Sequence, residues 1–455
     1  MRRPTDEAQR WIWHPFTQMR EWERETPILI AHGSGATLTD TEGRVYLDGV
    51  SSLWVNLHGH RHPKIDRALV RQIGKIAHST LLGLSHPAAV TLARRLLQLA
   101  PSGLARVFYS DNGSTAVEVA VKMAFGFWRH RGRPKKRKFI TFADAYHGDT
   151  LGSVSLGGIE LFHAFYQPLL FETLRVPAPT CYRCPIALTY PGCEMACLDA
   201  VEQTMRRHHR EIAGLVIEPL IQAAAGMWVA PPGYLARIRA LCSQYDILMI
   251  ADEVATGFGR TGTMFACAQE AVTPDLMAVA KGLTGGYLPL AATFATQAIY
   301  DAFLGEYAEW KTFFHGHSYT GNPLGCVAAL ASLDIFEEER VLAKLQAKVA
   351  LLRQLLAPWK RWRYVGDIRQ IGLMVGIELV AEKKNKTPYP LAMDVGRAVC
   401  RAARSRGVLL RPLGNVIVLM PPLCISMAQI RHLVAVVGQS IQATVRRCAG
   451  PTKSF

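Results

Sequence analysis

The middle of the chain alternates short apolar runs with longer amphipathic stretches. Short apolar runs bounded by turn residues are typical of buried strands, and apolar positions repeating every three or four residues are typical of helices. Strands are predicted at 106–111, 138–148 (with a turn), 170–176, 212–220, 248–251 and 276–280, and helices at 114–132 and 234–246. This alternation predicts an α/β fold with a mostly parallel sheet covered by helices on both faces.

The pattern changes after residue 325. One long helix is predicted over 326–359, short strands over 368–380, a second helix at about 391–406 and further strands within 407–423. This order is typical of an α+β unit. We therefore expect a large domain over 61–325 and a small C-terminal domain over 326–455. The segment 1–60 is expected to contribute to the small domain and to the active site.

Composition narrows the class of protein. The chain has 455 residues, of which 49% are hydrophobic and 19% charged, as in a globular protein. It contains no uncharged apolar run long enough to span a membrane, and the first twenty or so residues lack the apolar segment of a secretory signal. Six of the ten cysteines are isolated within predicted helices or strands. This usage indicates reduced thiols and a cytoplasmic protein.

The chain is strongly basic, with a formal net charge of +16. Its dense basic runs are "RHRGRPKKRK" (129–138), "RRHHR" (206–210) and "KRWRY" (360–364). We interpret them as solvated surface segments that favour anionic small molecules. A nucleic-acid partner is not expected, because no helix-turn-helix pattern precedes residue 13 or follows residue 440.

Polar side chains follow the predicted strands at the points where these strands end. Asp111, Tyr146, Glu218, Asp252 and Lys281 each lie at or just beyond such an end. Ligands of parallel sheets bind outside the carboxyl ends of the strands. The sequence therefore predicts that these five side chains converge on one site.

The chemistry of these residues points to a pyridine cofactor. Burial lowers the pKa of a lysine and makes its amine a nucleophile toward carbonyl groups. A carboxylate such as Asp252 can keep a pyridine nitrogen protonated, which is the arrangement used with pyridoxal phosphate. Gly113, Ser114 and Thr115 open a predicted helix whose free N–H groups favour a phosphate, although the same residues alone would also suit an ordinary helix cap. Tyr146 is placed to stack on the ring.

Several ordered motifs carry a family resemblance. They are "SDNGSTAVEVAVKMA", "AYHGDTLGSVSLGG", "IEPLIQAAAGM", "DEVATGFGRTG", "AVAKGLTGGYLPLAATFAT" and "HGHSYTGNPLGCVAALA". Together they resemble the class III aminotransferases of fold type I over nearly the whole chain. "WHPFTQM" (13–19), "SSLWVNLHGHRHPKI" (51–65) and "LLRPLGNVIVLMPPL" (409–423) resemble the 7,8-diaminopelargonate synthase family, also called adenosylmethionine–8-amino-7-oxononanoate aminotransferases.

This resemblance implies a role for each matching residue. Lys281 would hold pyridoxal phosphate and move the proton, Asp252 would pair with the ring nitrogen, Glu218 would support the cofactor, and Tyr146 would stack on it. The phosphate would be bound by Gly113, Ser114 and, from the other subunit of a homodimer, Ser318. The implied substrate-binding residues are Phe16, Trp54, Tyr146, Lys281, Gly316 and Arg411, the last for the carboxylate, with Arg260 and Asp149 shaping the site. The expected activity is amination of 8-amino-7-oxononanoate in biotin biosynthesis.

Two departures bear on the amino donor. Family members that use S-adenosyl-L-methionine commonly have a Trp-Trp pair and "HPYT", whereas this chain has Leu53-Trp54 and Phe16 in "HPFT". "SSLWVNLHGHR" and "FFHGHSYTGN" resemble members that take the amino group from lysine. The donor is therefore S-adenosylmethionine or lysine. An ω-amino acid or diamine transaminase of class III is the alternative, and it would need a different arginine for the carboxylate.

Four cysteines form a separate cluster, "CYRCPIALTYPGCEMAC". Cys181, Cys184, Cys193 and Cys197 have ligand-like spacing, and four thiolates suit structural zinc or an iron–sulfur cluster. Four reduced thiols without a metal are the alternative. The catalytic interpretation does not depend on this cluster.

Overall fold

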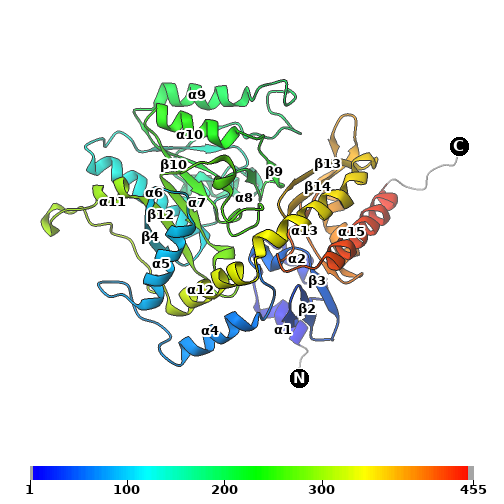
Figure 1. Ribbon diagram of the computed structural model, residues 1–455. Coiled ribbons are helices and arrows are strands. Elements are labelled where there is room, and N and C mark those ends of the chain that lie inside the picture. The colour runs from blue at the N-terminus through cyan, green and yellow to red at the C-terminus, as the bar shows by residue number, and fades with distance from the viewer. Residues whose placement is uncertain (1–3, 449–455) are drawn as a thin grey trace.

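A seven-stranded sheet forms the centre of the computed structural model, which describes residues 4–448 (Figure 1). Its strand order is β4-β12-β11-β10-β7-β5-β6. The strands are β4 Leu104–Ser110, β5 Lys138–Phe142, β6 Leu174–Val176, β7 Ile212–Ile217, β10 Leu248–Asp252, β11 Leu276–Val279 and β12 Ala291–Thr296. β12 pairs antiparallel with both β11 and β4, and the other pairs are parallel. The predicted mostly parallel sheet is confirmed.

Helices cover both faces of this sheet. α6 (Gly113–His130) packs on one face with Leu248 and Ile250 of β10. Met249 and Ala251 of the same strand point to the opposite face, into a second core cluster that includes residues of α5 (Pro87–Leu99), α10 (Tyr234–Gln244) and α12 (Pro323–Glu338). Because successive side chains of a strand alternate between faces, a fully apolar run is what a strand covered on both sides requires.

The predicted single helix over 326–359 is wrong. The chain forms α12 (Pro323–Glu338) and α13 (Val341–Leu356), followed by a 3₁₀ turn at Ala357–Arg361. Between the two helices, Arg340 has a φ of 53°, in the left-handed region that ends a right-handed helix. The apolar periodicity continues across this break, because both helices bury a face, and so the pattern does not reveal it.

The C-terminal part contains two smaller sheets. One has the order β13-β14-β18-β17, with β15 paired to β14. Its strands are β13 (Val365–Ile371), β14 (Met374–Glu382), β15 (Thr387–Pro388), β17 (Arg411–Leu413) and β18 (Val416–Leu419). The other has the order β1-β2-β3-β16, with β1 at Ile30–Ser34 and β2 at Thr37–Asp40, and in it N-terminal β3 (Val45–Asp48) pairs with β16 (Val408–Leu409). The N-terminal strands therefore lie with the C-terminal unit (Figure 1). The domain limits at 60 and 325 stay predictions, and residues 1–3 and 449–455 of the outer segments lie outside the described residues.

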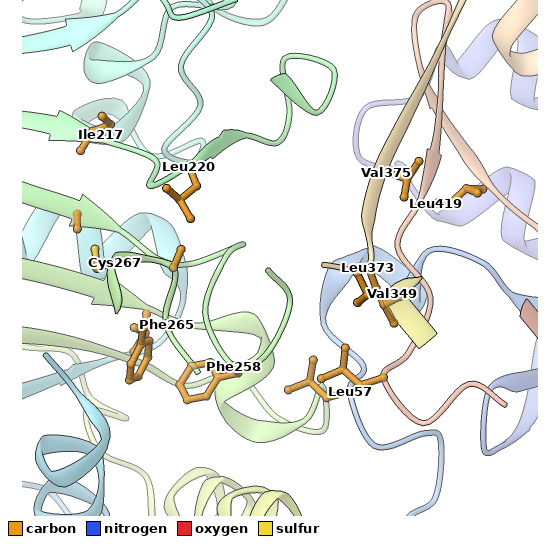
Figure 2. Packing of buried hydrophobic residues seen from close by; sticks show 14 of the residues in the cluster. Leu57, Ile217, Leu220, Phe258, Phe265, Cys267, Val349, Leu373, Val375 and Leu419 are labelled. Atoms are coloured by element: carbon orange, nitrogen blue, oxygen red, sulfur yellow. The ribbon is translucent and has the colours of Figure 1, made fainter. Parts of the chain in front are cut away.

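The two units share a packed seam. One cluster of buried residues runs from Ile217 and Leu220 of the large unit through Leu57 and Leu373 to Leu419 of the C-terminal sheet. Figure 2 shows Leu57 beside Leu373 and Val349. None of the helices in residues 4–448 has the length and apolar character needed to cross a membrane.

Candidate active site

A cavity of about 750 Å³ opens at the carboxyl ends of the parallel strands. Its walls include all five residues expected to converge: Asp111, Tyr146, Glu218, Asp252 and Lys281. Each lies at or just beyond the carboxyl end of one strand: β4, β5, β7, β10 or β11. Side chains at the carboxyl ends of parallel strands meet at one edge of a sheet, and so these five converge.

Lys281 lies directly after β11 and Ala280, with a left-handed φ of 44°. Its Nζ lies 5.1 Å from the centroid of the Trp54 ring. Burial lowers the pKa of Lys281, and the negative charges of Asp252 and Glu218 oppose this effect only in part. The amine is thus more available in its neutral, nucleophilic form than that of a surface lysine.

Asp252, the last residue of β10, is buried and faces His147. His147 Nδ1 lies 2.7 Å from Asp252 Oδ2, while Oδ1 accepts the N–H of Val254 at 3.0 Å. Burial disfavours the charged imidazole, but the hydrogen bond to Asp252 and the negative charges of Asp252 and Glu218 together outweigh it, and the pKa of His147 is raised. The pair therefore fixes the carboxylate and leaves it facing the cavity.

Glu218 lies beyond the end of β7 and is held by two backbone donors. The N–H of Tyr146 donates to Oε1 at 3.2 Å, and the N–H of Ala223 donates to Oε2 at 2.9 Å. Burial raises the pKa of Glu218 to about 7; His147 opposes this rise and Asp252 adds to it. This carboxyl group can therefore hold or release a proton near neutral pH.

The first turn of α6 forms an anion cradle. Asn112 caps the helix, its Oδ1 accepting the N–H of Thr115 at 3.0 Å, which leaves the N–H groups of Gly113 and Ser114 for a ligand. Ser114 Oγ lies 2.8 Å from Thr150 Oγ1. A Cβ on Gly113 would lie 2.5 Å from Val254 Cγ1, so only glycine fits beside this valine.

Tyr146 stands on one wall of the cavity. Its hydroxyl donates to Asp149 Oδ2 at 2.6 Å, and burial raises its pKa, so that it stays protonated. Its ring is nearly parallel to that of His163, with 6.3 Å between centroids, and Phe162 meets it edge-on. The side chain is thus held as a flat, rigid wall.

The far end of the cavity is apolar except for one cation. Phe16, Leu53, Trp54 and Phe162 contribute to the lining, with the guanidinium of Arg411 5.9 Å from the Phe16 ring. Within residues 4–448, no hydrogen bond or ion pair engages the Arg411 side chain. A free guanidinium in an apolar cavity is apt for a carboxylate.

Comparison with known proteins assigns the family. The Aminotransferase class-III model matches residues 18–441. The chain belongs to the class III aminotransferases. It is 57% identical over 437 residues to the adenosylmethionine-8-amino-7-oxononanoate aminotransferase of Geobacter sulfurreducens, covering 96% of each chain. It is 50% identical over 442 residues to the enzyme of that name from Anoxybacillus flavithermus, covering 97% of each chain.

Solved structures agree with this family. The adenosylmethionine-8-amino-7-oxononanoate aminotransferase of Methanocaldococcus jannaschii superposes with a TM-score of 0.92 at 43% identity, covering 96% of this chain and 98% of that one. The omega transaminase of Pseudomonas jessenii in complex with PMP gives a TM-score of 0.94 at 29% identity, covering 99% of this chain and 100% of that one. The chain is therefore a class III transaminase of fold type I.

The site residues of this aminotransferase fit pyridoxal phosphate. The free N–H groups of Gly113 and Ser114 suit its phosphate, the Asp252 carboxylate its ring nitrogen, and the Lys281 amine its aldehyde. The indole Nε1 of Trp54 and the imidazole Nε2 of His147 are buried without a partner among the described residues. The cavity thus offers complementary groups to each end of the cofactor.

Ser318 and Gly316 do not line the cavity of their own chain. Both are exposed in the segment between β12 and α12. Arg260 also lies outside the lining: it is fully buried and donates to the carbonyl oxygens of Pro421 and Asn56, each at 2.8 Å. It joins the two segments that lead to Arg411 and Trp54.

The four clustered cysteines line one small hollow, but the predicted metal site is not supported. Across residues 4–448, no group of three or more His, Cys, Asp or Glu side chains is arranged to hold a metal ion. Burial raises the pKa of Cys181 and raises that of Cys197 to about 11, and the charges of the neighbouring cysteines add to both shifts. Sequence spacing fixes the loop lengths but not the directions of the thiols.

Sequence reasoning missed several residues of the aminotransferase site. His147, Thr150 and Phe162 line the cavity without having been assigned a role. The signal for His147 was its place beside Tyr146 at a strand end. Phe162 comes from a short helix, α8 (Glu160–His163), whose sequence has no motif.

Proposed function

We propose that this aminotransferase converts 8-amino-7-oxononanoate to 7,8-diaminononanoate in biotin biosynthesis, with pyridoxal phosphate as its cofactor. The observation that carries the proposal is Arg411, a cation without a partner among the described residues, in the same cavity as Lys281. The relatives at 57% and 50% identity support it, because their names state this amino acceptor.

The cavity suits a long aliphatic acid. A carboxylate bound to Arg411 would extend its carbon chain along Leu53, Trp54 and Phe162 toward Lys281. Apolar walls stabilise such a chain by burying its surface, at about 0.8 kcal/mol for each methylene group. Because the Arg411 guanidinium can form two hydrogen bonds to a carboxylate, it would fix which end of the substrate lies at the far end of the cavity.

Residues of this chain carry the proton chemistry. Bound pyridoxal phosphate supplies an electron sink next to the carbon that carries the amino group. With the cofactor bound, the Lys281 amine, whose pKa burial lowers, would take the proton from that carbon and give it back during transfer of the amino group. Asp252, oriented by His147, holds a proton on the ring nitrogen, and Tyr146 excludes water from one face of the ring. Two half-reactions at one site give ping-pong kinetics.

The active enzyme is proposed to be a cytoplasmic homodimer. Exposed Trp310, Phe314 and Tyr319 surround Gly316 and Ser318 in the sequence, which supports a subunit interface in this segment. Ser318 would complete the phosphate site, and Gly316 the substrate site, of the other subunit. All ten cysteines are free thiols, which suits the reducing cytoplasm.

The amino donor is proposed to be S-adenosylmethionine or lysine. Phe16 and Leu53 both line the cavity and both are partly exposed, so they would contact a donor directly. Neither side chain offers a hydrogen bond. Donor selection would therefore depend on shape and apolar contact.

The test is the visible spectrum of the cofactor-loaded enzyme, titrated separately with S-adenosylmethionine, lysine and glutamate. A true donor should bleach the cofactor band, and 8-amino-7-oxononanoate should then restore it. Recovery with this keto acid supports the proposal and identifies the donor. Recovery only with the carbonyl compounds that correspond to ω-amino acids or diamines would instead favour the ω-transaminase alternative, of which one solved member superposes with a TM-score of 0.94.

Arg411 variants test the carboxylate site. Arg411→Gln should raise KM for the keto acid about 10- to 100-fold, the equivalent of a lost charge-assisted hydrogen bond. Arg411→Lys should recover part of this loss, because an ammonium is not bidentate. Arg406→Gln is the matched control, since Arg406 is exposed and, within residues 4–448, its side chain donates only to the Ala402 carbonyl. Unchanged KM in Arg411→Gln would refute the role of this residue.

A further inference from the structure

Two basic runs that are separate in the sequence surround a second cavity, of about 380 Å³. The cavity lies among the loops that lead into β5, β7 and β10. It is therefore at the amino ends of these strands, across the sheet from Lys281. The residues that matter here are Arg133, Lys135, Lys136, Arg210, Tyr245 and Asp246.

The charges around this cavity do not balance. Arg133 forms an ion pair with Asp246, the acidic residue of the lining. Lys135 and Arg210 are exposed, and no hydrogen bond or ion pair engages their side chains within residues 4–448. The nearby Glu211 is already paired with Lys138, at 2.8 Å. Lys135, Lys136 and Arg210 thus keep their positive charges without carboxylate partners.

Lys136 forms the floor of the cavity. It is 4% exposed, and its Nζ donates to the backbone oxygens of Ile212, at 3.3 Å, and Asp246. The same atom lies 4.1 Å from the centroid of the Trp128 ring. Burial lowers the pKa of Lys136 to about 8, with Asp246 opposing and Arg133 adding to the effect. A buried ammonium is costly when the carboxylate near it, that of Asp246, is already paired with Arg133, and an anion in the cavity would offset that cost.

We propose that this cavity binds an oligophosphate group, either free or as part of a nucleotide. The cations come from two separate segments, 133–136 and 210, and can contact neighbouring phosphate groups of one ligand at the same time. A ligand with a single carboxylate would contact fewer of them. The cavity is large enough for more than one phosphate and falls within the usual range for small-ligand sites. The half-buried Tyr245 ring on the wall offers a surface for a nucleotide base. This site is independent of the aminotransferase reaction.

The experiment is calorimetric titration of the cofactor-loaded enzyme with inorganic phosphate, tripolyphosphate and ATP. Saturable binding is expected for tripolyphosphate, at least 10-fold tighter than for phosphate. Lys135→Ala combined with Arg210→Ala should weaken it at least 10-fold. The control is Lys360→Ala combined with Arg361→Ala, which removes the same charge from the basic run at 360–364 and should leave affinity unchanged. Aminotransferase activity should be unaffected in both.

Two further arms identify the source of the phosphate groups. Equal affinities for tripolyphosphate and ATP mean that only phosphate is recognised. Tighter binding of ATP, lost in Tyr245→Leu, means that the ligand is a nucleotide. The proposal is overturned if tripolyphosphate gives no saturable signal, or if the control weakens binding as much as the cavity variant. It is also overturned if a short DNA duplex displaces tripolyphosphate. Should the double variant misfold, Arg210→Gln alone carries the same comparison.

Discussion

Asp252 and Glu253 are neighbours in the sequence, yet their buried carboxylates belong to separate hydrogen-bond networks. Asp252 bonds His147 and lines the active-site cavity. Glu253 turns away and accepts from Thr256 Oγ1 at 2.5 Å and from the N–H groups of Ala266 and Cys267 at 3.0 and 2.8 Å. Asp252 is therefore available to a cofactor, whereas Glu253 stabilises the turn after β10.

This division predicts opposite effects for two similar substitutions. Asp252→Asn should lower kcat on the order of 10²-fold or more with little change in Tm, because an amide cannot hold the ring nitrogen protonated. Glu253→Gln should keep kcat but lower the free energy of unfolding by about 1–3 kcal/mol, because one amide N–H group would face existing donors. Steady-state kinetics and thermal melts on both variants check this. If both variants changed kcat and Tm in the same way, the two carboxylates would not have separate roles.

His147 should act as a positioning residue. His147→Asn is expected to lower kcat about 10- to 100-fold while KM stays nearly constant, since the loss is in the orientation and charge of Asp252. The cofactor absorbance should change its pH dependence as well, which a purely structural role would not produce. His209→Asn provides the control, because His209 bonds the Arg206 carbonyl at 3.2 Å, at the amino ends of the strands and away from the cofactor site. Equal losses in both variants would argue against positioning.

Glu218 should make stability depend on pH. Its pKa rises from 4.5 in the unfolded chain to about 7, so the folded state binds the proton more tightly. Its contribution is therefore complete below about pH 4.5 and is lost as pH rises to 7. Glu218→Gln removes this dependence, and the difference in unfolding free energy between the two proteins should change by up to about 3 kcal/mol. Urea unfolding of cofactor-free protein at pH 5 and pH 8 measures it; parallel pH curves would exclude it.

Gly113 should be required for cofactor affinity. Gly113→Ala places a Cβ 2.5 Å from Val254 Cγ1, and overpacking of this kind costs about 1–3 kcal/mol. We expect the dissociation constant for pyridoxal phosphate to rise about 5- to 150-fold. Val254→Ala in the same chain should restore part of the affinity. Gly74→Ala, whose nearest neighbour would lie at 3.6 Å, should bind the cofactor normally.

The sequence predicted the site best where a charged side chain comes directly after an apolar run. Asp252 and Lys281 each follow an apolar run, and parallel strands deliver such residues to one edge without further information. His147 could not be assigned in this way, because its partner is Asp252, 105 positions away. The family resemblance supplied Arg411 and Ser318, because neither residue follows one of the apolar runs that marked the other site residues.

The fold was predictable where the apolar runs were uninterrupted. β10 and β11 are such cases, whereas the alanine-rich β12, which contains Thr293 and Thr296, was not assigned as a strand. The break at Arg340 was also missed, because a single left-handed residue leaves no trace in the apolar pattern. In the cysteine cluster, spacing suggested metal ligands, and the fold brings the four cysteines to one hollow, but not in an arrangement that could hold a metal ion within residues 4–448.

The pairing of β3 with β16 has a consequence for synthesis on the ribosome. Leu47 pairs with Val408, so β3 emerges about 360 residues before the strand that completes its sheet. At about 5–20 residues per second, the nascent chain waits roughly 20–70 s with this strand edge open. An open edge can pair with other chains, and so aggregation during synthesis should be most favoured in the interval before β16 has been made.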